Sequence, residues 1–303
     1  MQRALELFQQ AAQADPSYAP AYSGIADASA LLASWQFASP DAMYPKAVAA
    51  ARRAIELDPS SADAHASLGF IKLNWEWDWE GATSELHRAI ELNPSHETAH
   101  RWLSAFLAGI GKDEEAVPIA QRAIDLDPIS VLPDMNLGIV HFLAGRQEEA
   151  AAQFGRVIEK DPGFVRGYGF LAVSLSLLGR DEEAITSARR GTELANQHPM
   201  SLLPLGWCIA QGGDHEQAHM IIDPIVRDGL DPIYEAMSHA AFDDDAAALT
   251  ALERGYDERS DWMYAVATQP WFRRYHGNPR FVGLLERMKL LPALNQDRLS
   301  SER

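Results

Sequence analysis

An interval of 34 residues recurs through most of the chain and restricts what the chain can fold into. Four sets of residues keep this interval, and each set consists of a single residue type. The sets are Ala82, Ala116, Ala150, Ala184 and Ala218; Leu103, Leu137, Leu171 and Leu205; Gly111, Gly145, Gly179 and Gly213; and Pro94, Pro128 and Pro162. Repetition at a fixed interval of roughly 20–50 residues is typical of proteins that stack copies of one structural unit.

The residues between these markers predict what each copy contains. The glycines precede acid-rich stretches ("GKDEEA", "GRQEEA", "GRDEEA"), and negative charge stabilises the N-terminus of a helix. An apolar helical pattern precedes each glycine. A second one follows each alanine and stops at a proline, which disfavours helix in the residue before it. The repeated unit is therefore predicted to be a helix, a tight glycine turn, a second helix and a proline-containing turn.

A helix pair of this length, with small residues at the helix contact and a closing proline, resembles the tetratricopeptide repeat. The resemblance extends from about residue 1 to about residue 258. It implies an all-α fold, a right-handed α-solenoid (superhelix) of tandem antiparallel helix pairs. The chain departs from the family at a first-helix position that usually holds a large aromatic residue. His65, His100 and Asp134 stand at this position, whereas Tyr168 keeps an aromatic ring.

The same pattern divides the solenoid into its repeats. The solenoid is predicted over residues 1–258, and residues 1–16 form half a repeat. About seven helix pairs follow. An insertion around residues 34–45 lengthens the turn inside the first of these pairs, because Pro16 and Pro59 are 43 residues apart.

A different pattern begins after the solenoid. Residues 259–303 break the period, and we interpret them as a C-terminal capping segment. Pro279 is expected to open a final helix over about 279–290, since proline is favoured in the first turn of a helix. Terminal units of solenoids depart from the repeat because they must cover the end of the core with a polar face.

The first residues match a second helix without its first helix. Ala4 and Phe8 are in register with Ala150 and Phe154. A second helix of the family buries an apolar face against its own first helix, so the resemblance implies an apolar edge at this end. We therefore expect more chain upstream in the native gene product, and we expect the uncapped N-terminal end to allow a homodimer.

Three tryptophans alternate with acidic residues in "LNWEWDWEGATSELHRAIELN", residues 73–93. Counting back 34 from Gly111 reaches Trp77, which places this stretch in the turn between two helices. The insertion of the preceding repeat lies at the equivalent turn, so both groups of aromatic residues should meet along one edge. These residues are Trp35, Phe37, Trp75, Trp77 and Trp79. They either pack the insertion against the repeats or form an exposed contact site, since exposed apolar patches often mark interfaces.

In the tetratricopeptide family the first helix of each pair lines the concave face. The resemblance therefore implies a partner-binding groove lined by Phe70, Arg101, Met135, Asn136, Ile139, Phe142, Arg166, Val173, Leu203, Trp207 and Met237. Any one of them could equally be ordinary core between repeats. As a set they indicate an apolar groove containing Met and aromatic side chains, which suits a peptide segment with hydrophobic anchors.

Some family members hold an acidic peptide carboxy terminus with a clamp of Lys, Arg and Asn. Arg101, Asn136 and Arg166 match clamp positions, but Ala105 and Phe170 replace two other members. The net charge of −17 also disfavours an acidic ligand.

The segment His215-Glu216-Gln217-Ala218-His219 spells H-E-x-x-H, in which two histidines on one helix face can ligate zinc beside a glutamate base. His239 could be a third ligand. A zinc-dependent hydrolase is therefore an alternative function. The repeat itself already accounts for Glu216, which is 34 residues from Glu182. We therefore predict no metal, no cofactor and no enzyme activity.

Composition excludes other classes of function. A net charge of −17 disfavours binding to nucleic acid, which needs clustered Lys and Arg, and to anionic membranes. No apolar run approaches the ~20 residues that span a bilayer, and the first residues lack the apolar core of a signal peptide. The single cysteine, Cys208, lies in an apolar stretch and is predicted to be a buried thiol. A cytoplasmic location fits best.

A finer resemblance concerns "AYSGIADASALLASW" and the ending "PWFRRYHGNPRFVGLLERMKLL". These stretches are similar to the repeat region that follows a winged-helix DNA-binding domain, or a Ser/Thr protein kinase domain, in many bacterial signalling proteins. The kinase motifs and the winged helix do not occur in this sequence, so neither activity is inferred. The expected function is a non-catalytic protein-protein interaction scaffold that binds a peptide or partner protein. A self-associating structural scaffold is a further alternative.

Overall fold

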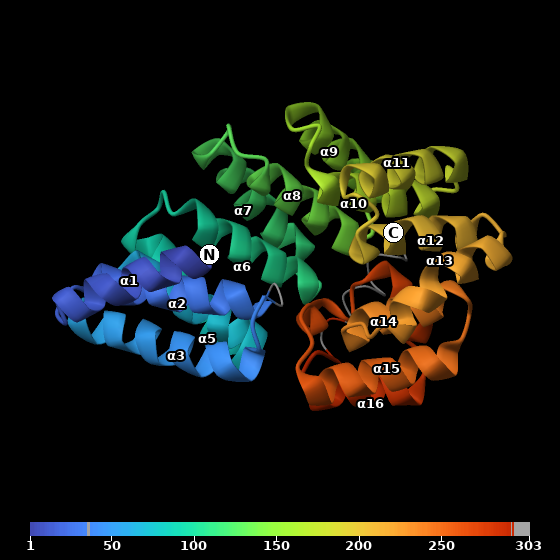
Figure 1. The fold of residues 1–303 in the computed structure, drawn as a ribbon. Helices are drawn as coiled ribbons and strands as arrows, with labels where there is room; N and C mark the ends of the chain where they lie inside the picture. The colour runs from blue at the N-terminus through green and yellow to red at the C-terminus, as the bar shows by residue number, and fades with distance from the viewer. Residues whose placement is uncertain (35–36, 292, 294–303) are drawn as a thin grey trace. The chain divides into compact units, whose positions relative to one another are not determined.

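The computed structural model describes residues 1–34, 37–291 and 293. Throughout these residues the regular structure is helical, and no strand occurs among them. The prediction of an all-α fold of tandem antiparallel helix pairs is confirmed (Figure 1). The chain forms two compact units, unit 1 over Met1–Leu103 and unit 2 over Ser104–Arg303.

Unit 1 contains the single helix α1 and the first helix pairs. Its helices are α1 (Gln2–Ala14), α2 (Ala19–Ser34), α3 (Pro40–Leu57), α4 (Ala62–Ile71), a π-helical turn η1 (Lys72–Glu76), α5 (Trp79–Leu92) and the first part of α6 (Glu97–Gly109). The pairs are α2 with α3 and α4 with α5.

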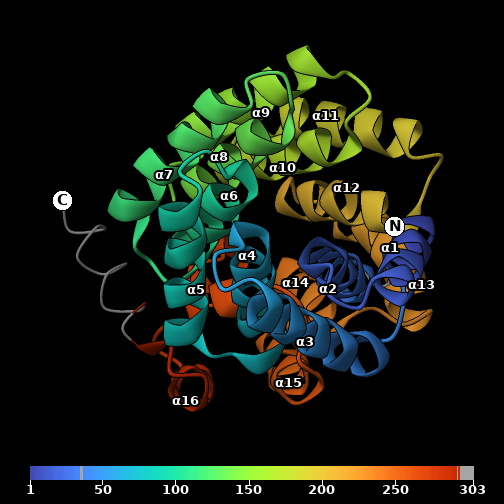
Figure 2. The same cartoon turned by 90° about the vertical axis from the view of Figure 1, so that its left-hand side faces the viewer.

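Unit 2 continues the repeats and then leaves them. Its repeat helices are α7 (Asp113–Leu126), α8 (Leu132–Leu143), α9 (Gln147–Lys160), α10 (Val165–Leu177), α11 (Asp181–Leu194), α12 (Pro199–Gln211), α13 (His215–Arg227), α14 (Pro232–Ala241) and α15 (Asp245–Glu258). Two 3-10 helices, η2 (Met263–Ala265) and η3 (Pro270–Tyr275), and α16 (Pro279–Arg287) follow. Figures 1 and 2 show α16 beside α15, where Arg280 forms an ion pair of 2.7 Å with Glu253.

The glycine turns have the conformation that requires glycine. The φ angles of the four repeated glycines are positive, at 81° for Gly111, 78° for Gly145, 73° for Gly179 and 93° for Gly213. A residue with a Cβ is strained in this region. After Gly145, the N–H of Arg146 donates to the carbonyl of His141 over 2.9 Å, which satisfies an orphan carbonyl at the end of α8.

In five helix pairs, from α4–α5 to α12–α13, the two residues at one contact between the helices are matched in size. A Cβ added to Gly138 of α8 would lie 2.4 Å from the ring of Phe154 in α9, and one added to Gly206 of α12 would lie 2.5 Å from Ile222 in α13. Gly69 and Leu86 make the same match in unit 1. In the intervening repeats, the same two positions hold Ser104 with Ala120 and Ala172 with Ala188. Among these five pairs, the first helix carries glycine where the second helix carries a large residue.

A polar side chain fixes the turn before the first helix in two of the repeats. The hydroxyl of Tyr168 donates to the carbonyl of Pro162 over 3.1 Å. At the equivalent position His65 lies 3.2 Å from the carbonyl of Pro59. These are the positions where the family usually places a large aromatic residue.

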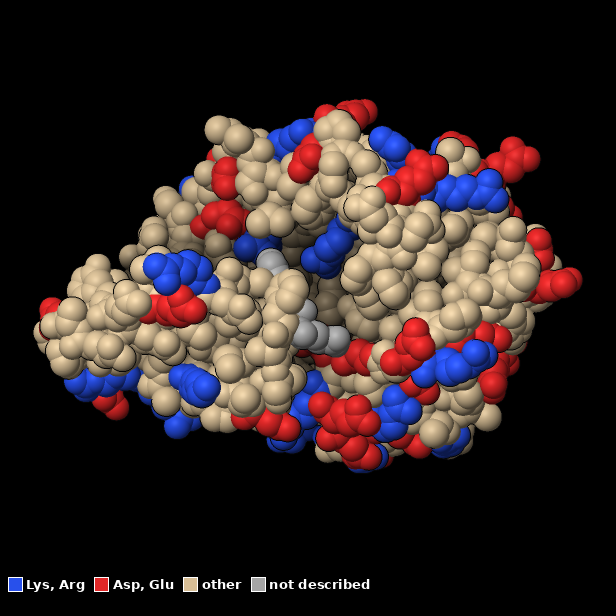
Figure 3. Space-filling model, in the orientation of Figure 1, with Lys and Arg blue, Asp and Glu red and all other residues tan. Residues whose placement is uncertain are grey.

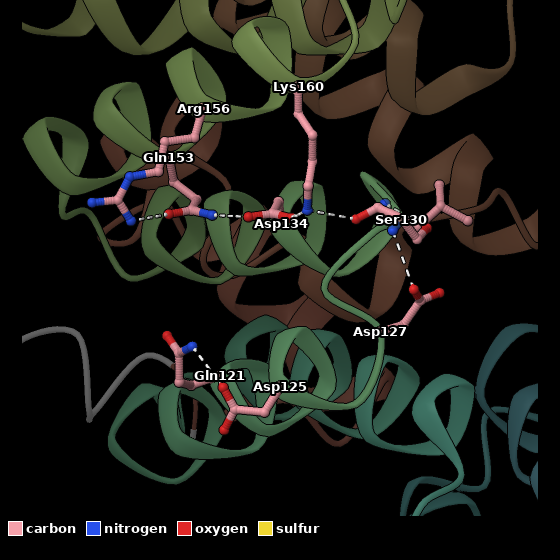
Figure 4. A network of polar contacts seen from close by, with 9 residues as sticks. Gln121, Asp125, Asp127, Ser130, Asp134, Gln153, Arg156 and Lys160 are labelled. Carbon is pink, nitrogen blue, oxygen red and sulfur yellow. Dashed lines mark hydrogen bonds and ion pairs between the residues drawn. The ribbon is translucent and has the colours of Figure 1, made fainter.

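In α8 this position holds Asp134, which takes part in a polar network in place of the hydrogen bond made by Tyr168 (Figure 4). Its carboxylate accepts from Gln153 over 3.0 Å and from Lys160 over 2.5 Å. Lys160 also donates to the carbonyl of Ser130 over 3.0 Å. The network therefore connects α8, α9 and the turn before α8.

Among the described residues, none of the helices has the length and apolar character needed to span a bilayer.

Candidate functional site

In unit 2, residues 262–276 of the chain lie against the first helices of the repeats. The ring of Trp262 is 6.0 Å from that of Phe170 in α10. The ring of Trp271 is 5.4 Å from Phe142 in α8 and 6.0 Å from Trp207 in α12, the latter edge to face. Aromatic pairs at these separations stabilise a fold beyond the area that they bury. We call residues 262–276 the return segment.

Polar contacts hold the return segment at the C-terminal ends of the first helices. The hydroxyl of Thr268 donates to the carbonyl of Gly109, the last residue of α6, over 3.1 Å. Arg273 Nη2 donates to the carbonyl of Leu143, the last residue of α8, over 3.0 Å. The last carbonyls of a helix lack intrahelical donors. The return segment supplies donors to these carbonyls.

The return segment is itself deeply buried. A Cβ on Gly109 would lie 2.6 Å from the ring of Tyr264, and that ring is 6.2 Å from Phe106. Burial raises the pKa of Tyr264 above its ordinary value, and the nearby Asp261 carboxylate acts in the same direction. Met263 and Gln269 are also fully buried. The return segment is therefore part of the core of unit 2.

The predicted groove residues of unit 2 have little accessible surface. The side chains of Met135, Asn136, Ile139, Phe142, Val173 and Trp207 are buried. Leu203 and Met237 are half-buried, whereas Arg166 is exposed, with its guanidinium 6.0 Å from the ring of Phe170. Asn136, a clamp position in the resemblance, donates to the hydroxyl of Ser104 over 2.8 Å. Six of these residues are therefore buried, and the binding of a partner by the set stays a prediction.

The inner helices of unit 1 carry the remaining predicted groove residues. The rings of Phe70 in α4 and Trp102 in α6 are 4.5 Å apart. Both side chains are half-buried, as is Arg101, whose guanidinium Nε donates to Glu97 over 2.9 Å. Sequence reasoning did not select Trp102, although it lies between Arg101 and the repeated Leu103.

A buried carboxylate lies between two neighbouring inner helices of unit 1. The hydroxyl of Ser67 in α4 donates to Asp27 Oδ1 in α2 over 2.5 Å. Burial raises the pKa of Asp27 to about 6, and the Ser67 hydrogen bond opposes this shift. Asp63 lies nearby, with its carboxylate 3.0 Å from His96 Nε2, and that hydrogen bond lowers the pKa of Asp63. Sequence reasoning missed Asp27 because nothing in the periodicity marks it.

The tryptophan-rich turn of unit 1 divides into two stacked pairs. Trp75 stacks on the buried ring of Tyr44 in α3, with centroids 5.0 Å apart. Trp77 and Trp79 stack on each other at 6.1 Å. Phe37 is 62% exposed, and Trp35 lies outside the described residues. Packing is thus observed for Trp75, and a contact role for the other aromatic residues stays a prediction.

The backbone at this turn is unusual. Trp77 has a φ of 54° at the position where four other repeats place glycine. A left-handed backbone conformation is unfavourable for a bulky residue by ~1–2 kcal/mol. Asp78 accepts from the N–H of Gly81 over 3.0 Å and from Lys72 Nζ over 2.6 Å, so its carboxylate caps α5 as expected for an N-cap aspartate.

The described contacts of His219 and His239 are with acidic and aromatic side chains. His219 lies 3.0 Å from Asp223 Oδ1 and stacks on Phe242 with centroids 3.8 Å apart. His239 is 3.8 Å from Glu235. Within the part of the chain that the structure describes, no three His, Cys, Asp or Glu side chains are arranged to hold a metal ion. Cys208 is buried as predicted, and burial raises the pKa of its thiol to about 12.

Residues 78–129 and 135–199 match the tetratricopeptide repeat family. A search of curated protein sequences gives no match. PilW, described as a widely conserved type IV pilus biogenesis factor, is 20% identical over 75% of this chain and 98% of PilW, with a TM-score of 0.54. PilF of Pseudomonas aeruginosa is 22% identical over 67% of this chain and 91% of its own, with a TM-score of 0.52.

Yeast Tom70 is 14% identical over 95% of this chain and 62% of Tom70, with a TM-score of 0.56. At these sequence identities, the three likenesses bear on the fold alone.

Proposed function

We propose that this chain is a non-catalytic scaffold that binds a peptide segment or partner protein on the inner helices of its helix pairs. The match of residues 78–129 and 135–199 to the tetratricopeptide repeat family and the tandem helix pairs of the described residues support this proposal. The observation that carries this proposal is the half-buried pair of Phe70 and Trp102 beside Arg101 in unit 1. Aromatic and arginine side chains are enriched among the residues that dominate binding energies. The corresponding aromatic side chains of unit 2 are already covered by the return segment.

The return segment suggests what kind of ligand such a surface accepts. It is not an α-helix; it inserts aromatic rings between those of the first helices and donates to their terminal carbonyls. We therefore infer that the ligand of unit 1 is a non-helical segment with an aromatic anchor. The overall charge of −17 favours a neutral or basic segment.

The setting of this function follows from the finer sequence resemblance. We propose that the chain is the repeat region of a bacterial signalling or transcription-regulatory protein, located in the cytoplasm, and that it recruits a protein partner. Binding to nucleic acid or to an anionic membrane is not part of the proposal, since the net charge is −17.

Affinity capture with matched variants tests the proposal. The native chain, Trp102→Ala, Arg101→Glu and Arg88→Glu would each be immobilised and exposed to a lysate of the native host, and bound proteins identified by mass spectrometry. Arg88 is the control because, like Arg101, it pairs with a glutamate on its own helix, but it is exposed on α5.

We expect the native chain and Arg88→Glu to capture the same protein. Trp102→Ala and Arg101→Glu should lose it while remaining folded at the temperature of the assay, as circular dichroism would show. Equal capture by all four chains would exclude the inner helices of unit 1 as the binding surface.

The zinc-dependent hydrolase is tested separately. Elemental analysis of the purified protein, with His215→Gln/His219→Gln as control, measures zinc directly. Zinc bound at one equivalent to the native chain but not to this variant would favour the hydrolase. The stacking of His219 on Phe242 favours a packing role.

A further inference from the structure

A single hydroxyl group connects two neighbouring first helices of unit 1. Ser67 Oγ in α4 lies 2.5 Å from Asp27 Oδ1 in α2 and 2.8 Å from the carbonyl oxygen of Asp63, one turn earlier in α4. Both distances are those of hydrogen bonds between oxygen atoms. Ser67 is only 1% exposed, so the hydroxyl depends on these two protein groups for its hydrogen bonds.

The number of hydrogen atoms at this contact depends on the protonation of Asp27. A serine hydroxyl has one hydrogen to donate, and its lone pairs accept. If Asp27 is ionised, both neighbours of the Ser67 hydroxyl are acceptors, and its one hydrogen serves only one of them. If Asp27 is protonated, its carboxyl group donates to Ser67, and Ser67 donates to the carbonyl of Asp63. Only the protonated carboxyl group therefore makes hydrogen bonds of both short contacts.

The charged groups around Asp27 come from α4 and from the turn before α6. Burial is the largest cause of its raised pKa; the carboxylate of Asp63 raises the pKa further, and His96 lowers it. His96 Nε2 is 3.0 Å from Asp63 Oδ1. Among the described residues, no titratable group of α1 or α3, which also pack on α2, contributes to this shift. Figure 3 shows the surface over α1 and α2 mainly in tan, with few charged groups. Ionisation of Asp27 therefore places a second carboxylate beside that of Asp63, with His96 as the compensating group.

We propose that Asp27, Ser67 and the Asp63 carbonyl form a proton-dependent link between α2 and α4, complete when Asp27 carries a proton and broken when it is ionised. In the ionised state Ser67 turns its hydrogen to the carboxylate and leaves the Asp63 carbonyl to its helical N–H donor. Mildly acidic pH therefore tightens the stacking of α2 on α4, and ionisation loosens it. This link does not depend on the proposed partner surface.

Hydrogen–deuterium exchange of the full chain near pH 5 and near pH 7.5, corrected for the pH dependence of the exchange chemistry, measures how often α2 opens. Asp27 has a pKa of about 6 in the closed state and an ordinary 3.8 once α2 opens. Opening should therefore be roughly tenfold more frequent at the higher pH, because the closed state holds a proton that the open state releases. Asp27→Asn should reduce this change to within about twofold, since an amide keeps the hydrogen bond with Ser67 in either direction.

Two further variants separate the link from other effects of charge. Asp63→Asn is the matched control, because it makes the same substitution at the exposed carboxylate of the neighbouring helix. It should keep a change of at least about fivefold, since burial is the main cause of the raised pKa of Asp27. Asp27→Leu should also lose the pH dependence. Near pH 5, however, its α2 should open roughly three- to tenfold more often than that of Asp27→Asn, because leucine makes no hydrogen bond with Ser67.

Carbon-13 labelling of the aspartate carboxyl groups reports the protonation of Asp27 directly, and the loss of one signal in Asp27→Asn assigns it. This signal should titrate near pH 6 in the native chain and at a higher pH in Ser67→Ala, which removes a donor to the ionised form. Circular dichroism melting confirms that each variant is folded. Four results would overturn the proposal: a native α2 that opens equally at both pH values, an Asp63→Asn variant that loses the pH dependence as fully as Asp27→Asn, an Asp27→Leu variant that opens no more than Asp27→Asn, or an Asp27 signal that titrates below about pH 4.5.

Discussion

The inner helices of the two units carry similar side chains and use them differently. In unit 2, Phe142 and Trp207 contact Trp271 of the return segment and are buried. In unit 1, Phe70 and Trp102 contact each other and remain half-buried. An aromatic residue at a given repeat position is therefore not a binding residue or a core residue by its position alone. Its role depends on whether another part of the chain packs against it.

The largest effect should follow from emptying the core of unit 2. Tyr264→Ala removes a buried ring from between Phe106 and Gly109 and should lower the free energy of unfolding by ~3–5 kcal/mol. Trp102→Ala in unit 1 should cost only ~1–2 kcal/mol, because its ring is half-buried. Urea denaturation followed by circular dichroism measures both. Equal costs would contradict the distinction between a filled and an accessible inner surface.

The second largest change in stability should follow from substitutions at the contacts between the two helices of a repeat. Gly138→Ala places a Cβ 2.4 Å from Phe154 and should cost ~1–3 kcal/mol by overpacking. Gly155→Ala, whose Cβ would meet nothing within 4 Å, should stabilise α9 by up to ~1 kcal/mol through helix propensity.

Adding Phe154→Ala to Gly138→Ala should relieve the overpacking, since Ala172 and Ala188 form such a pair in the next repeat. The double-mutant cycle would show a favourable coupling. Purely additive losses would mean that the two positions do not meet.

The pH dependence of unit 1 should change when its buried carboxylate is neutralised. The pKa of Asp27 is raised from 3.8 to about 6 by burial. Between these two pH values the carboxyl group is protonated in the folded state and ionised in the unfolded state. The free energy of unfolding that Asp27 contributes therefore falls as pH rises from about 4 to about 6.

Asp27→Asn should remove this fall and raise stability at pH 7 by ~1–3 kcal/mol. Ser67 can donate to the asparagine oxygen as it does to the carboxylate. Denaturation curves at pH 4 and pH 7 provide the measurement. A variant that is less stable than the native chain at pH 7 would refute the assignment of a destabilising buried charge.

The smallest effect on stability should come from the tryptophan-rich turn. Trp77→Gly removes the left-handed strain at that residue but also the stack on Trp79, so the two effects should largely cancel, to within ~1 kcal/mol. Thermal melting and partner capture are measured together. Loss of capture at an unchanged melting temperature would establish the turn as a contact site, whereas retained capture would leave it a packing element.

The repeat architecture could be predicted from the sequence because each periodic residue is fixed by packing. Ala150 recurs because its position is fully buried, and Gly145 recurs because its φ is positive. The return segment could not be predicted in this way, since it lies outside the repeat and packs against residues more than a hundred positions earlier, such as Leu143. Its two tryptophans in "DWMYAVATQPW" were the available signal.

The chemistry of the inner surface was predictable only in part. Most of the residues selected for the groove in unit 2 are buried, because the periodic pattern does not distinguish a covered surface from an open one. Asn136 occupies a position that resembles a ligand clamp, yet it bonds Ser104 of the neighbouring repeat. The burial of Asp27 depends on the stacking of α2 on α4, which a single helix pattern does not contain.

The pairing of small with large residues has a consequence for how such a chain can be cut and rejoined. The match of Gly138 with Phe154, and the network from Ser130 through Asp134 to Lys160, both lie inside residues 128–161. Recombination at the proline turns therefore transfers a whole module with its volumes and polar groups already matched. A break at a glycine turn would join the first helix of one module to the second helix of another. Where Ala172 then faced Phe154, the methyl group would meet the ring, and where Gly138 faced Ala188, a void would remain.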